Sequence, residues 1–173
     1  MTSVLNVEAW ASFFSSTAQI SGGLVGLVFV ALTFKPRMFG ADGDVALRSL
    51  ASQVFADFLN VLLGSLILLT PSPSPRLVGS VFLILGGVGS ARLVRSWLEI
   101  RRSEPARSSR RPIVRRFAMS LGGNLAFLAS GAIALLAPQR VDCLWYSLVT
   151  GVLVLMLSGS RGAWLLVTHE VVP

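Results

Sequence analysis

The sequence predicts an all-α integral membrane protein, a helical bundle of about five transmembrane helices. Hydrophobic residues make up 53% of its 173 residues and charged residues only 13%, and the mean hydropathy is +0.73. A chain of this composition cannot cover itself with a wettable surface, so most of its surroundings must be lipid. The apolar residues also fall into long runs, separated by short charged or proline-rich stretches, and these runs have the length that a membrane requires.

Each apolar run is long enough to cross about 30 Å of hydrocarbon as a helix. A cluster of prolines at 71–75 predicts a stiff turn after the second run. A basic loop at 101–111 separates the third run from the fourth, and no polar segment is long enough to form a soluble domain. We therefore expect a single membrane domain, 1–173, with spans at about 10–34, 45–70, 76–100, 112–137 and 143–168.

Basic residues are placed unevenly along the chain, whose net charge is +7. They concentrate in the first and third loops, which the positive-inside rule assigns to the cytoplasm. With five spans, the N-terminus is then outside and the C-terminus cytoplasmic. Because these residues flank apolar runs, they favour anionic lipid at the cytoplasmic face over nucleic acid. The residues expected to bind lipid headgroups are Arg101, Arg102, Arg107, Arg110, Arg111, Arg115 and Arg116.

The sequence contains few residues that could hold a metal or a cofactor. Cys143 and His169 are the only residues of their kinds, so neither a disulfide framework nor a dedicated zinc site can be assembled. No arrangement of residues indicates a reaction. We expect no catalytic residues, no metal and no cofactor.

Polar residues inside the spans form the first candidate site. Asp57 lies near the middle of the second span, where an acidic residue costs about 2.5 to 3.5 kcal/mol on insertion scales. Gln53 and Asn60 share a helix face with Asp57 because they are spaced by four and three residues. Counting 1.5 Å per residue places polar residues of three other spans at a similar depth. The expected intramembrane polar layer consists of Gln53, Asp57, Asn60, Arg92, Asn124 and Arg161.

Two interpretations of this layer are open. In the first, Asp57 pairs with Arg92 or Arg161, and the neutralised network locks the helices together. In the second, the layer is a conduction or gating element, since intramembrane ionisable residues often mark ion or proton pathways. Two arginines beside one aspartate would then favour an anion or a lipid headgroup over a cation.

Small residues form a second pattern inside the spans. Glycine, alanine and serine at four-residue spacing let helix backbones approach closely in lipid. This spacing can serve packing within one chain or the self-association of several chains into a homo-oligomer. The expected helix-packing residues are Ala18, Gly22 and Gly26 in the first span, Gly86 and Ser90 in the third, and Gly159 and Ala163 in the fifth.

Three parts of the chain carry a likeness to a known family. The first part comprises Trp10–Phe14, 18–20 and 26–32. The second is the break at 68–71, and the third comprises 144–146 and 163–167. Together they resemble a family of small bacterial integral membrane proteins often labelled as modulators of the membrane protease FtsH. The resemblance implies a multi-pass protein of the bacterial inner (plasma) membrane without catalytic activity. Ser160-Arg161 departs from the apolar or Asn-containing stretch expected there.

Two hypotheses for the function follow. The leading one is a non-enzymatic inner-membrane protein that acts through helix association, as a regulator or scaffold for a membrane partner such as a quality-control protease. The alternative is a small homo-oligomeric ion channel or transporter whose polar layer lines a water-filled path.

Overall fold

The computed structural model describes residues 8–33, 45–103 and 110–168, and the regular structure in these ranges is entirely helical. Five of the helices are long and apolar enough to cross a membrane, which confirms the predicted fold class. The elements are a short 3-10 helix η1 (Glu8–Trp10) and the helices α1 (Ala11–Thr33), α2 (Val45–Leu68), α3 (Pro75–Ser103), α4 (Arg110–Leu136) and α5 (Val141–Thr168).

The turn between α2 and α3 follows from its proline and serine residues. Ser74 caps α3, because the Leu77 N–H donates to the Ser74 Oγ at 3.2 Å. Pro75 occupies the first helical position, where its fixed φ suits the helix and its missing N–H is not needed. Ser72 adopts a φ of 50°, in the left-handed region, and this residue lets the chain reverse within the short proline-rich segment.

The basic loop differs from the prediction, because both flanking helices extend into it. α3 continues to Ser103 and α4 begins at Arg110, so only 104–109 lies between them. Pro112 falls in the first turn of α4, where proline is tolerated, and arginine is a good helix former. Of the predicted headgroup ligands, Arg101 and Arg102 lie in the last turn of α3, and Arg110, Arg111, Arg115 and Arg116 in the first two turns of α4. Arg107 lies outside the described residues.

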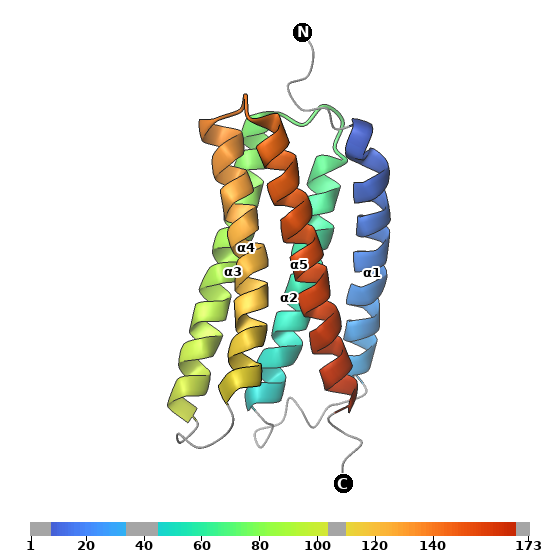
Figure 1. Cartoon of the computed structure of the whole chain (residues 1–173). Helices are drawn as coiled ribbons and strands as arrows, with labels where there is room; N and C mark the ends of the chain where they lie inside the picture. Colours follow the sequence, from blue (N-terminus) through green and yellow to red (C-terminus); the bar gives the residue numbers. More distant parts are fainter. Residues whose placement is uncertain (1–7, 34–44, 104–109, 169–173) are drawn as a thin grey trace.

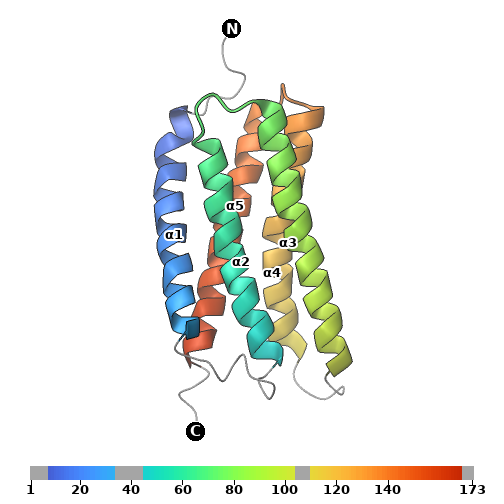
Figure 2. The same ribbon diagram turned by 180° about the vertical axis from the view of Figure 1, so that it is seen from behind.

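The helices are arranged as a ring of four with one helix outside it. α2, α3, α4 and α5 form the ring, in which each helix packs against its two neighbours (Figure 1). α1 packs mainly against the outer side of α2, as the view from behind also shows (Figure 2). α2 is therefore the central element, with α1, α3 and α5 around it.

Two apolar clusters form the core. The larger one includes residues of all five long helices, and within it the rings of Phe82 and Phe127 meet edge to face, with centroids 5.0 Å apart. Near the start of α1, Trp10 stacks on Trp145 of α5 with ring centroids 5.9 Å apart. The smaller cluster, toward the other end of the bundle, is built around Phe58 where α1, α2 and α5 meet.

Glycine sets the distance between the helices of the ring. A Cβ atom placed on Gly86 would lie 2.7 Å from the backbone oxygen of Asn124, and one placed on Gly131 would lie 2.7 Å from the backbone nitrogen of Leu83. The backbones of α3 and α4 therefore approach too closely for any larger residue. Similar positions occur between α4 and α5 at Gly123 and Gly151, and between α2 and α5 at Gly159 and Gly162.

Candidate functional site

Asp57 is the centre of the polar layer inside the ring. Its side chain is 3% exposed, and both of its carboxylate oxygens accept hydrogen bonds from serines. Ser120 of α4 donates to Oδ1 at 2.6 Å, and Ser158 of α5 donates to Oδ2 at 2.9 Å. A single carboxylate therefore ties α2 to both α4 and α5.

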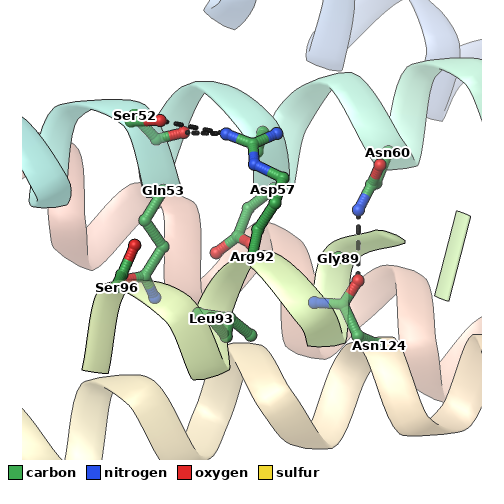
Figure 3. Close-up of a pocket in the computed structure, with 10 residues that line it drawn as sticks. Ser52, Gln53, Asp57, Asn60, Gly89, Arg92, Leu93, Ser96 and Asn124 are labelled. Atoms are coloured by element: carbon green, nitrogen blue, oxygen red, sulfur yellow. Dashed lines mark hydrogen bonds between the residues drawn. The ribbon is translucent and has the colours of Figure 1, made fainter. Parts of the chain in front are cut away.

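A pair of asparagines forms the next level of the layer. The Asn60 Nδ2 donates to the Asn124 Oδ1 at 3.1 Å, and the Asn124 Nδ2 donates to the Ser120 backbone oxygen at 2.8 Å. This pair crosses the ring from α2 to α4 beside Gly89 of α3 (Figure 3). A Cβ atom at Gly89 would overlap the Asn124 Oδ1, so glycine is needed for the two amides to meet.

The two arginines of the predicted layer do not pair with Asp57. The Arg92 Nη2 donates to the Ser52 Oγ at 2.9 Å and to the Ser52 backbone oxygen at 3.3 Å. The Arg161 Nη1 donates to the Met119 sulfur at 3.1 Å. Both arginines are exposed. The difference has a physical reason: long arginine side chains reach outward toward the helix ends, whereas serine fits beside a buried carboxylate.

Three serines that the sequence did not predict complete the layer: Ser52, Ser120 and Ser158. Serine in a membrane helix commonly donates to a carbonyl of its own helix, as Ser21 does to the Thr17 oxygen at 2.6 Å, so its presence alone indicates little. A usable signal was nevertheless present. Ser120 precedes Asn124 by four residues and so shares its helix face.

A small cavity lies beside these residues, between α2 and α3 (Figure 3). The volume open to the centre of a water molecule is about 20 Å³, which is room for about one water. Its wall runs from the exposed Arg92 to the buried Asp57, so it connects the surface to the layer. The lining residues are Ser52, Gln53, Ala56, Asp57, Asn60, Gly89, Arg92, Leu93, Ser96 and Asn124.

The predicted packing residues divide between the ring and its outside. Gly86 lies at the α3–α4 crossing, and Gly159 and Ala163 lie where α5 meets α2. Ser90 of α3 is partly buried, and its hydroxyl has no hydrogen-bond partner in the part of the chain that the structure describes. On α1, Ala18 is buried, and a Cβ at Gly22 would touch Leu62 of α2 at 3.8 Å. Gly26 instead faces outward, with nothing within 4 Å of its Cβ position.

The outward side of α1 is an unusual surface for a helix of this kind. We name it the outer stripe; it consists of Ser12, Ser16, Gln19, Gly23 and Gly26. These residues are all exposed and follow one another at steps of four, three, four and three, which places them along one line of the helix. Among the described residues, the Gln19 amide donates only to Ser15 of its own helix, at 3.3 Å. Only 22% of the apolar segment of α1 is buried, against 44% in α2.

The chemistry within reach of the polar layer is hydrogen bonding and charge. Within the described ranges, His, Cys, Asp and Glu do not gather in a group of three that could hold a metal ion. The serine donors compensate the charge of Asp57 in part, and the Arg92 guanidinium remains within electrostatic range of it. No family model, no curated protein and no solved structure matches this chain.

Proposed function

We propose that this is a non-enzymatic membrane protein that acts through helix association, first with a second copy of itself. The observation that carries the proposal is the outer stripe of α1. Serine and glutamine side chains that face hydrocarbon can hydrogen-bond to a polar face of another helix, and glycine lets that helix approach closely. The Gln19 amide is both donor and acceptor, so two copies inserted in the same direction can pair through it across a two-fold axis.

The polar layer supports this proposal as a structural lock. Both oxygens of Asp57 and the facing amide groups of Asn60 and Asn124 find partners within one chain. A network closed in this way holds α2, α4 and α5 in register, so that α1 rests on a rigid support. The adjacent cavity has room for about one water, which is too little for a continuous aqueous path.

The proposed setting is the bacterial inner membrane, with the N-terminus outside and the C-terminus in the cytoplasm. α1, α3 and α5 end, and α2 and α4 begin, at one end of the bundle (Figure 1). This is also the end with the arginines of α3 and α4, which the positive-inside rule assigns to the cytoplasm. The resemblance to modulators of FtsH suggests a quality-control protease as a further partner, regulated or scaffolded without catalysis by this chain.

A second candidate function is a small homo-oligomeric channel or transporter. The observation in its favour is the cavity that leads from the exposed Arg92 to the buried Asp57. Conduction would require this cavity to lengthen into a path past Asn60 and Asn124, and Asp57 would then set the ion selectivity.

Ion flux from liposomes, with native mass spectrometry of the same preparation, separates the two candidates. We expect an oligomer that conducts no ions, and an Asp57→Asn variant that is less stable and also silent. Asp142→Asn is the matched control, because Asp142 is an exposed carboxylate in the first turn of α5. Ion flux that changes with Asp57→Asn and not with Asp142→Asn would overturn the association proposal in favour of the channel.

A further inference from the structure

The mouth of the cavity presents hydrogen-bond donors that the chain does not use. Arg92 donates to Ser52 only through Nη2, and its Nε and Nη1 have no acceptor among the residues that the structure describes. The amide of Gln53 and the hydroxyl of Ser96, which line the same cavity, also have no partner within the described ranges. Figure 3 shows these side chains on facing sides of the α2–α3 groove. All three groups line the same cavity, which therefore offers hydrogen-bond donors to the oxygen atoms of a ligand.

The depth of this mouth limits what can fill it. The apolar segment of α2 begins at Arg48, and Ser52 lies about 6 Å further along the helix. The apolar segment of α3 ends at Leu98, about 9 Å beyond Arg92. The Arg92 guanidinium therefore lies just inside the hydrocarbon boundary, where unused polar groups are costly. A ligand that reaches this guanidinium must carry a hydrogen-bond acceptor and must partition into the bilayer.

We infer that the mouth of this cavity binds the phosphate of an anionic phospholipid, with Arg92 as its principal ligand and Gln53 and Ser96 as additional donors. A guanidinium matches phosphate oxygens in a bidentate geometry. The headgroup would approach from the bundle end that carries the arginines of α3 and α4, which attract anionic lipid. The acyl chains would follow the α2–α3 groove.

Asp57 does not oppose this assignment, although it lines the same cavity. Its oxygens accept hydrogen bonds from Ser120 and Ser158, which belong to α4 and α5, whereas the phosphate would sit at the mouth beside Arg92 of α3. The carboxylate at the floor keeps the anion at the mouth and prevents it from entering the layer. This site involves α2 and α3 and is independent of the outer stripe of α1.

The test is the thermal stability of the purified protein in detergent, titrated with a short-chain phosphatidylglycerol. We expect the lipid to raise the Tm of the wild-type protein, and the Arg92→Gln variant to lose apparent affinity about tenfold or more, relative to its own baseline. Arg95→Gln is the matched control, because Arg95 is exposed on the same helix but does not line the cavity. Should Arg92→Gln fold poorly, Arg92→Lys, which keeps the charge without the fork, is compared with Arg95→Lys.

Two further titrations identify the source of the phosphate. We expect inorganic phosphate and a short-chain diacylglycerol without phosphate to leave the Tm unchanged, and native mass spectrometry to show a retained phospholipid that Arg92→Gln releases. An equal rise with inorganic phosphate would replace the lipid with a free anion. An equal loss of affinity in Arg95→Gln would show that the lipid binds by general electrostatic attraction to the surface, and would overturn the proposed site.

Discussion

Glycine has opposite surroundings at the α3–α4 crossing and on the outward side of α1. At Gly131 of α4, an added Cβ would press against the backbone of α3, 2.7 Å from the Leu83 nitrogen and 2.8 Å from the Gly79 oxygen. At Gly23 and Gly26 of α1, the same atom would meet nothing within 4 Å. Glycine therefore lies against a neighbouring helix in one region and has no neighbouring helix in the other. We attribute the open positions to a helix of another molecule, because polar residues accompany them in the outer stripe.

The largest expected difference between the two regions is in folding stability. Gly131→Ala should lower the free energy of unfolding by about 1 to 3 kcal/mol, because the backbone atoms around it cannot move aside. Gly23→Ala should leave the stability of the monomer unchanged or raise it slightly, since alanine is the better helix former. Denaturant titration of both variants in micelles measures the difference. Equal losses of stability in the two variants would show that α3 and α4 pack less closely than the distances at Gly131 indicate.

The polar layer should show a smaller, pairwise effect. Asn60 and Asn124 form one amide–amide hydrogen bond, so Asn60→Ala and Asn124→Ala should each destabilise the bundle. A double-mutant cycle should give a coupling energy of about 0.5 to 1.5 kcal/mol. Pairing either change with Gln139→Ala, in the exposed α4–α5 turn, provides the uncoupled reference. Strictly additive losses would mean that the two amides do not interact.

On the outer stripe, a substitution should affect association and not folding. Gln19→Leu should weaken dimerisation by about 1 kcal/mol, because the reciprocal amide pair is lost, while monomer stability is retained. Analytical ultracentrifugation in density-matched detergent measures this change. Thr150→Leu replaces an exposed polar residue of α5 and is the control. A dimer of undiminished affinity in Gln19→Leu would place the contact elsewhere.

The smallest effect is expected at Arg161. It is exposed, and within the described ranges its guanidinium donates only to the Met119 sulfur, so Arg161→Gln should change the free energy of unfolding by less than about 0.5 kcal/mol. Parallel denaturation of the wild type and the variant checks this value. A large loss would indicate that Arg161 supports Asp57 after all.

The sequence was sufficient to predict the five spans, because their length and the charges between them follow directly from the membrane. It also placed Asp57 and Asn60 on one interior face, since a buried polar face has a helical period. The partner of Asp57 could not be predicted. Opposite charge favoured an arginine as the partner, whereas in the structure Ser120 and Ser158 donate hydrogen bonds to the carboxylate. Residue type alone does not distinguish these two serines from other serines in the helices.

On α1, the sequence pattern did not separate residues that pack within the chain from residues that face outward. The four-residue spacing of Ala18, Gly22 and Gly26 joins residues with different surroundings: Ala18 is buried and Gly22 lies beside Leu62 of α2, while Gly26 faces outward. The positions of small residues alone do not predict which side of a helix packs against a neighbouring helix. The alternating steps of the outer stripe became visible only once the packing of α1 on α2 was known.

Disulfide cross-linking in native membranes probes association through the outer stripe at single positions. Single cysteines would replace Ser16, Gln19, Gly23 and Gly26 in turn, in a Cys143→Ser background that removes the exposed native thiol. Phe29 and Ala31, exposed on α1 but off the stripe, provide the controls. We predict cross-linked dimers at the stripe positions and little at Phe29→Cys or Ala31→Cys. Cross-linking that is absent from the stripe, or equally strong around the helix, would show that the chains do not associate through the outer stripe.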